Sequence, residues 1–148
     1  MSKSINNWLL GICACACFAC DSTTPPDDAG PNENPFDAQV ARGADLYTAH
    51  CADCHGADGR GTAQGPALVG LEDGALPLEP REGSVRDTQF KTVGDVAAFA
   101  AANMPPGNPG SLQVDEYYAI LAFDLSANGI VLEEELTAAL AEELVIPR

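Results

Sequence analysis

The feature that most constrains this chain is the pentapeptide Cys51-Ala52-Asp53-Cys54-His55. Two cysteines three positions apart lie on one side of a helical turn, where their sulfurs can form thioether bonds to the two vinyl groups of a haem. The imidazole one residue further on then lies under the iron. A disulfide between two thiols this close together would close only a very short loop, so it would add little stability. The motif therefore predicts one covalently attached haem c, with His55 as a ligand of its iron.

Two other uses of paired cysteines have to be weighed against haem attachment. A thioredoxin-like dithiol needs a βαβ context, and no such context is visible in the sequence. A structural zinc ion needs four ligands, and the candidate domain could supply only Cys51 and Cys54 together with His50 and His55. We favour the haem interpretation over both alternatives.

The first residues, 1–19, are typical of a signal peptide. Lys3 precedes an apolar run of twelve residues from Trp8 to Ala19, which ends in small side chains. A helix that spans a membrane needs about 20 apolar residues, so a permanent transmembrane helix is the weaker interpretation. The chain is therefore predicted to be exported.

Residues 17–20 (Cys-Phe-Ala-Cys) resemble a lipoprotein processing site, in which the cysteine after a small residue is lipidated and becomes the new N-terminus. We expect this modification at Cys20. Residues 12–15 (Ile-Cys-Ala-Cys) form a competing site, but cleavage there would leave apolar sequence at the mature end. Asp21 resembles an inner-membrane retention signal of enteric bacteria, a rule that does not hold in every lineage, so the choice of membrane stays open.

The charge of the chain limits its partners. With 22 acidic and 7 basic residues, the net charge of -15 would repel nucleic acid and anionic lipid head groups. Lipid chains on Cys20 would therefore have to hold the protein on a membrane. Redox protein partners with a basic docking face would be attracted, although the acidity is equally consistent with solubility alone. Residues 20–35 are rich in proline and acids and lack large apolar side chains, which predicts a flexible tether.

The remaining sequence predicts helices joined by long loops. Apolar residues at helical spacing predict a first helix that is entered after Pro35 and runs into Cys51. Residues 56–91 hold glycine and proline without periodicity, which is typical of loops wrapped around a cofactor. A capping box at 92–95 predicts a second helix, and a third is expected over roughly 114–126, closed by Asn-Gly. In the tail, 130–148, leucines recur every four residues and predict a short amphipathic helix packed on the domain surface.

Residues 36–129 resemble the class I monohaem cytochromes c. The resemblance implies an all-α, cytochrome c-like fold of three to five short helices and long loops wrapped around one covalently bound haem. Residues 65–70 (Gly-Pro-Ala-Leu-Val-Gly) are similar to a family loop whose proline carbonyl accepts a hydrogen bond from the proximal imidazole, a role that falls to Pro66. The distal ligand of the family is a methionine in a Met-Pro context, and Met104 is the only methionine besides the initiator.

The family also packs its first and last helices crosswise through small and aromatic residues. Gly43 with Tyr47 on the first helix, and Ile120 with Phe123 on the last, match this pattern. Asp124 departs from it, because relatives usually place an apolar residue there. We expect this carboxylate, close to a helix end, to face solvent.

Several other side chains are weaker candidates for the site. Arg81, Arg86 and Lys91 lie in the loop before the distal ligand and are predicted either to bond the haem propionates or merely to offset nearby acids. Lys91 is also a remote alternative to Met104 on the iron. His50 is expected to be a surface residue of the first helix.

The resemblance implies a carrier of single electrons on the periplasmic side of a bacterial membrane, with no catalytic residues. His55 and Met104 would hold the iron six-coordinate, so that it changes oxidation state with little rearrangement. One alternative is a haem enzyme or gas sensor with an open or displaceable distal position. Another is a cytochrome subunit of a larger dehydrogenase or oxidase, because residues 116–129 look like cytochrome domains that serve periplasmic dehydrogenases.

Overall fold

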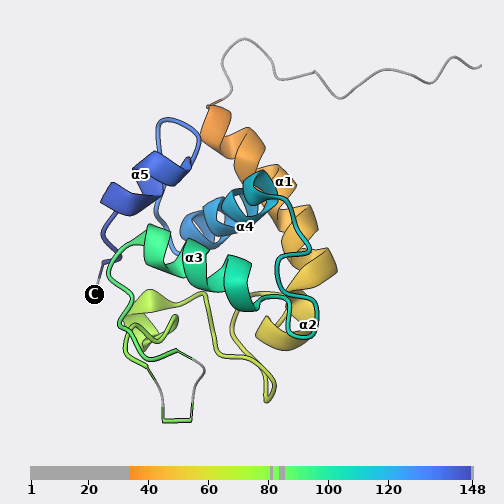
Figure 1. The fold of residues 1–148 in the computed structure, drawn as a ribbon. Helices are drawn as coiled ribbons and strands as arrows, with labels where there is room; N and C mark the ends of the chain where they lie inside the picture. Colours follow the sequence, from red (N-terminus) through yellow and green to blue (C-terminus); the bar gives the residue numbers. More distant parts are fainter. Residues whose placement is uncertain (1–33, 81, 84–85, 148) are drawn as a thin grey trace, which may run out of the picture.

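The computed structural model describes residues 34–80, 82–83 and 86–147. The predicted signal peptide, Cys20, the tether as far as residue 33 and Arg81 lie outside the described residues. The elements in order are α1 (Pro35–His50), α2 (Ala52–His55), the 3-10 turn η1 (Leu71–Asp73), α3 (Val93–Asn103), α4 (Val114–Ala127) and α5 (Ala138–Glu143) (Figure 1). In the described part of the chain the regular secondary structure is helical, apart from one isolated bridge between Thr92 and Val145. This confirms the all-α prediction.

Capping side chains start two of the helices where the sequence predicts. Asn34 precedes α1 and its side chain accepts a hydrogen bond from the Phe36 amide at 3.0 Å. The Thr92 hydroxyl accepts from the Asp95 amide at 3.2 Å, and the Asp95 carboxylate accepts from the Thr92 amide at 3.0 Å. This is the capping box expected at the start of α3. The helix α4 ends at Asn128, and the following Gly129 has the positive φ of 77° that closes a helix.

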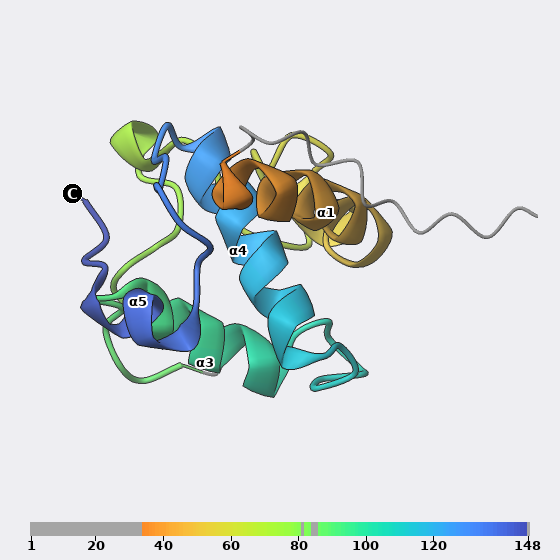
Figure 2. The ribbon, with the colours of Figure 1, turned by 90° about the horizontal axis from the view of Figure 1, so that it is seen from above.

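The helices α1 and α4 cross in close contact, as Figure 2 shows. A Cβ atom on Gly43 would lie 1.9 Å from the backbone oxygen of Ala119, so only glycine allows the two helices to approach this closely. Next to this point the rings of Tyr47 and Phe123 pack at 5.0 Å between centroids. The predicted crossing through a glycine and aromatic residues is therefore confirmed.

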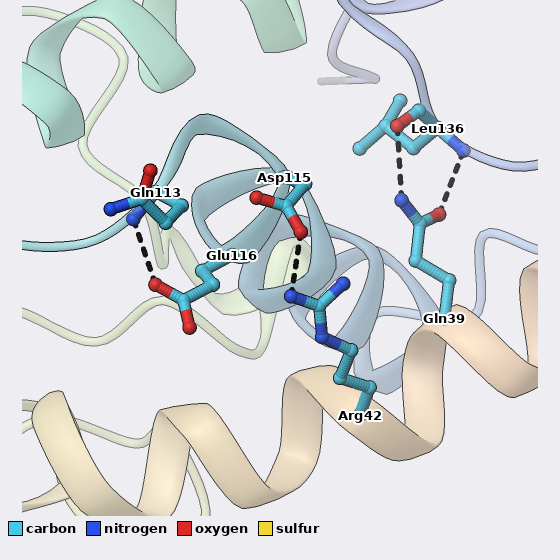
Figure 3. Close-up of polar contacts among 6 residues, drawn as sticks. All are labelled: Gln39, Arg42, Gln113, Asp115, Glu116 and Leu136. Carbon is cyan, nitrogen blue, oxygen red and sulfur yellow. Dashed lines mark hydrogen bonds and ion pairs between the residues drawn. The ribbon is translucent and has the colours of Figure 1, made fainter. Parts of the chain in front are cut away.

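The C-terminal tail packs on the domain, as expected, but its helix is shorter than the leucine spacing predicts. Only residues 138–143 are helical in the tail, because the Thr137 side chain caps the helix there and Thr137 itself has an extended backbone. Leu136 is nevertheless almost fully buried. Its backbone is held by Gln39 of α1, whose side-chain amide donates to the Leu136 carbonyl at 3.0 Å and accepts from its amide at 2.8 Å (Figure 3). A side chain on α1 thus replaces the backbone hydrogen bonds that a longer helix would have made.

Other polar contacts at the surface secure the same helices. Figure 3 shows the ion pair between Arg42 of α1 and Asp115 at the start of α4, with 2.6 Å between Nη2 and Oδ2. Both side chains are exposed, so solvent screens this pair and it contributes little to stability. The Glu116 carboxylate accepts from the Gln113 amide at 2.7 Å and caps the start of α4 (Figure 3).

No helix in the described ranges combines the length and apolar character needed to cross a membrane. The buried core lies between α1, α3, α4 and the tail. Its largest apolar members are Phe36, Phe90, Val93, Leu121, Leu125, Leu136 and Ile146. Beside this core, toward α2 and the loops, the same elements enclose a cavity.

Candidate functional site

An apolar cavity of about 560 Å³ lies between α2, α3, α4 and the loops that join them. This volume is within the range of roughly 300 to 1,000 Å³ that is typical of cofactor sites. Its walls are mostly aliphatic and aromatic side chains, among them Leu68, Phe90, Val96, Phe99, Ile120 and Leu121. Cys51, Cys54, His55, Pro66 and Met104 all border it, so the fold brings every cofactor-binding residue predicted from the sequence to one cavity.

The two cysteines are presented by a single helical turn. Cys51 ends α1 with a φ of -123°, which breaks the helix, and α2 begins at the next residue. The amides of Cys54 and His55 both donate to the Cys51 carbonyl, at 3.1 and 2.9 Å. Both cysteines are half-buried free thiols.

The thiol of Cys51 is not activated for redox chemistry or metal binding. Burial, and after it the nearby charges of Asp124 and Cys54, together raise the pKa of this thiol to about 12. A reactive dithiol needs a lowered pKa, because the thiolate is the nucleophile and the metal ligand. Within the ranges that the structure describes, no three His, Cys, Asp or Glu side chains are grouped so as to hold a metal ion. These observations do not favour the thioredoxin-like and zinc alternatives.

The imidazole of His55 is buried and fixed by one hydrogen bond. Its Nδ1 atom lies 2.8 Å from the carbonyl oxygen of Pro66, so Nδ1 carries the proton and donates it. The lone pair of Nε2 is then available to a metal. Gly65 allows this approach, because a Cβ there would lie 2.7 Å from the Cys54 carbonyl oxygen. Pro66 therefore makes the contact that the resemblance implies, and its effect on iron stays a prediction.

Met104 borders the cavity from a later part of the chain, directly after α3. It ends α3, with its amide still bonded to the Ala100 carbonyl at 2.8 Å, and the following Pro105 cannot continue the helix. The hydroxyl of Tyr117 on α4 donates to the Met104 carbonyl at 2.7 Å and accepts from the Gly110 amide at 3.2 Å. In the sequence, Tyr117 falls within the helix predicted over roughly 114–126, with no indication of a polar role. The signal for its second role is chemical, because a buried phenol needs a hydrogen-bond partner.

A second polar residue that sequence reasoning missed is Asn128. Beyond ending α4, its side chain donates to the Leu68 carbonyl at 3.0 Å and accepts from the amides of Gly70 and Leu71 at 2.8 and 3.2 Å. These bonds fix the loop after Pro66 against α4. The loop that carries the His55 acceptor is therefore anchored to the helix that lines the far side of the cavity.

Among the described residues, Arg86 is the expected propionate donor that borders the cavity. Its guanidinium donates to the backbone carbonyls of residues 77, 78, 79 and 88 at 2.5 to 2.8 Å, and it lies 3.7 Å above the ring of Phe90. Arg86 thus holds the long loop in place, and a bond to a propionate stays a prediction. Lys91 is exposed and does not line the cavity, so it is poorly placed for its alternative role as distal ligand. His50 is exposed, as expected, at the cavity rim.

The prediction that Asp124 faces solvent is wrong. Asp124 follows Ile120 and Leu121 by four and three residues, so all three side chains lie on the helix face that lines the cavity. Its Oδ1 atom is inaccessible to solvent and has no hydrogen-bond partner within the described residues. Burial raises the pKa of this carboxyl group to about 8.

Comparison with known proteins agrees with the predicted haem site. The family model described as Cytochrome c matches residues 40–127. The chain is 31% identical over 102 residues to the cytochrome c subunit of the cytochrome bc1 complex from Corynebacterium efficiens, covering 59% of this chain and 33% of that protein. It is 30% identical over 84 residues to a thiosulfate dehydrogenase from Stutzerimonas stutzeri, covering 57% of this chain and 26% of that protein. The chain thus spans a third or less of the length of these curated relatives.

Among solved structures, the chain is similar to the sulfane dehydrogenase SoxCD from Paracoccus pantotrophus. The TM-score is 0.55 with 31% sequence identity, over 78% of this chain and 59% of that chain.

Proposed function

Because the chain belongs to the cytochrome c family, which binds haem c covalently, we propose that it is a class I monohaem carrier that passes single electrons between redox protein partners, and is not itself an enzyme. The observation that carries this proposal is the convergence of Cys51, Cys54, His55 and Met104 on one apolar cavity. When bound there, the haem iron supplies the one-electron change of oxidation state. The protein contributes attachment, ligation and exclusion of water.

Each of these residues has a proposed role. Cys51 and Cys54 form the thioethers to the haem vinyl groups from the single turn that presents both sulfurs. His55 ligates the iron through Nε2, and the Pro66 carbonyl orients its ring and increases its basicity. Met104 supplies its thioether sulfur as the second protein ligand of the iron. A methionine ligand raises the reduction potential relative to a second imidazole.

The apolar walls suit this role, because they would exclude water and substrate from the haem that His55 and Met104 would hold. Within the described residues, the Oδ1 atom of Asp124 on the cavity wall is shielded from solvent and has no hydrogen-bond partner. A porphyrin is large, flat and apolar, and the aliphatic and aromatic lining matches it. The donor set and the apolar lining of the cavity therefore fit a haem.

We also propose the cellular setting from the sequence. Residues 1–19 would direct export, and lipidated Cys20 would anchor residues 20–35 as a tether on the periplasmic side of a bacterial membrane. Residues 36–129 would form the cytochrome domain, and 130–148 its packed tail. The net charge of -15 suits partners with a basic docking face, and such docking would weaken as salt is raised.

The relatives suggest a second candidate, a cytochrome subunit of a larger oxidoreductase. Two of the similar proteins are described as a subunit of the bc1 complex and as the sulfane dehydrogenase SoxCD. Affinity purification from the native membrane distinguishes the two candidates. A stoichiometric dehydrogenase or oxidase subunit in the eluate would support the complex, and a lone cytochrome would support the free carrier.

We predict that the wild-type protein, produced together with haem-maturation machinery, keeps its haem on a denaturing gel and shows a sharp reduced α band. A Cys51→Ala, Cys54→Ala double variant should lose all haem on that gel, because no thioether can form. Lys91→Ala is the matched control, since this side chain is exposed away from the cavity, and should keep full staining. A wild-type protein without covalent haem would overturn the proposal. A high-spin spectrum that shifts rapidly with carbon monoxide or peroxide would instead support the enzyme or gas-sensor alternative.

A further prediction concerns the hydroxyl that holds the Met104 loop. Tyr117→Phe leaves the Met104 carbonyl and the Gly110 amide without their partner, at a cost of about 1 to 3 kcal/mol. We expect carbon monoxide to displace Met104 from the reduced iron roughly tenfold more readily, as measured by the binding rate. Tyr118→Phe removes a neighbouring hydroxyl that makes no hydrogen bond to this loop within the described residues, and this variant should bind carbon monoxide as the wild type does. Equal rates in both variants would mean that Tyr117 does not position Met104.

A further inference from the structure

One polar group of the cavity has no part in the proposed ligation. Asp124 lies on α4 among apolar side chains, and its Oδ1 is shielded from solvent without a hydrogen-bond partner in the described part of the chain. An ionised carboxylate with one oxygen shielded from solvent and unpartnered is costly, unless a compensating charge lies nearby. The position of Asp124 on the cavity wall therefore points to a neighbouring group that compensates the charge of its carboxylate.

Within the described residues, the groups that face Asp124 or border the same cavity leave its Oδ1 without a hydrogen-bond partner. From α1, Tyr47 and Cys51 face it closely enough that its charge raises the pKa of both groups, after the larger effect of burial. The Tyr47 hydroxyl is already committed to the Gly56 carbonyl at 2.8 Å. The titratable or charged side chains that border the same cavity are His50, Cys51, Asp53, Cys54, His55, Arg86 and Tyr117. Among these, the fixed cation is Arg86, and it is bonded to four backbone carbonyls.

We propose that Asp124 is a proton-binding site coupled to the oxidation state of the haem, so that the protein takes up a proton when it accepts an electron. The proposal rests on the proposed function, because it requires the haem that Cys51 would attach beside Asp124. It adds a second activity to electron transfer, namely redox-linked proton exchange.

The coupling follows from charge. A ferric haem carries one more positive charge than a ferrous haem and therefore stabilises a nearby carboxylate. On reduction, one electron passes from the donor protein to the iron, and one proton passes from water to the Asp124 carboxylate, so the net charge of the pair is unchanged. Oxidation reverses both transfers, and no bond to the iron forms or breaks. Inside an apolar cavity this attraction is stronger than in water.

The direction of the pH dependence is fixed by this scheme. Burial places the pKa of Asp124 at about 8, close enough to neutral for the proton to exchange. The ferric charge lowers the pKa and its loss on reduction raises it, so the two oxidation states have different pKa values. Between these values the reduction potential falls as pH rises, because reduction then consumes a proton. Below and above this window the potential is independent of pH.

The test is the reduction potential of the holoprotein, measured by spectroelectrochemistry from about pH 5 to about pH 10. Within the window we expect the equilibrium constant for reduction to fall by up to tenfold per pH unit, which is about 59 mV for a one-electron couple. Asp124→Asn should give a flat profile. Asp45→Asn removes the same charge from an exposed position on α1 and should keep the wild-type slope. A slope that survives in Asp124→Asn would assign the proton to another group, such as a haem propionate, and would overturn the proposal.

Two further measurements test whether Asp124 is the group that takes up the proton. If Asp124→Asn does not retain haem, Asp124→Leu places an apolar side chain on the same wall and should also flatten the profile. In the wild type, the ferrous-minus-ferric infrared difference spectrum should show the carbonyl stretch of a newly protonated carboxylic acid, and its absence would contradict the inference. A wild type without covalent haem would defeat the proposed function, whereas a haem-bearing wild type with a flat profile would defeat this inference alone.

Discussion

Replacing Met104 by alanine is expected to convert the protein from a closed electron carrier into one with an open iron. The thioether is the distal ligand in our proposal, and Lys91, the alternative ligand, is exposed and does not line the cavity. The weak far-red ferric band of sulfur ligation should disappear, and carbon monoxide should bind the reduced iron rapidly. The reduction potential should fall by a sizeable part of the roughly 0.8 V that axial ligands can span.

The control for Met104→Ala is a change of similar size on the same cavity. Leu112→Ala removes apolar volume from the cavity wall and takes away no sulfur. It should keep the far-red band and a potential close to that of the wild type. If the band persisted in Met104→Ala, or vanished equally in Leu112→Ala, Met104 would not be the iron ligand.

Replacing Gly43 by alanine is expected to have the largest effect on stability. The added Cβ would lie 1.9 Å from the oxygen and 2.5 Å from the carbonyl carbon of Ala119, and these backbone atoms can move only if α1 and α4 separate. Overpacking of this kind costs typically 1 to 3 kcal/mol, and we expect about 3 kcal/mol here. The better helix propensity of alanine, worth about 1 kcal/mol, offsets only part of this cost.

Thermal unfolding of the holoprotein, followed by circular dichroism, measures the effect of Gly43→Ala. A domain of this size loses roughly 4 to 8 °C of melting temperature per kcal/mol, so we expect a drop on the order of 10 °C. Ala41→Leu adds side-chain volume to the exposed surface of the same helix and should stay within about 0.5 kcal/mol of the wild type. An unchanged melting temperature for Gly43→Ala would mean that the helices do not touch at this residue.

Sequence patterns of short range predicted most of the helical frame. The capping box at Thr92 and the Asn-Gly end of α4 depend on residues within one helical turn, so they can be recognised without a fold. The leucine spacing of the tail predicted too long a helix, because this pattern also depends only on residues that are close in the sequence. Periodicity describes which residues share a helix face, but it does not reveal that Gln39 binds the backbone of Leu136 from a distant helix.

The sequence by itself determined the chemistry of the site, because the CxxCH spacing needs only one helical turn to present two sulfurs and an imidazole, and because Met104 is the only methionine in the candidate domain. The tertiary structure alone decided which polar groups surround that chemistry. Tyr117 contacts Met104, and Asp124 faces the cavity, only because α4 is fixed in rotation by its crossing with α1 at Gly43. The direction in which a helix presents its side chains depends on the packing between helices, which is a property of contacts far apart in the sequence.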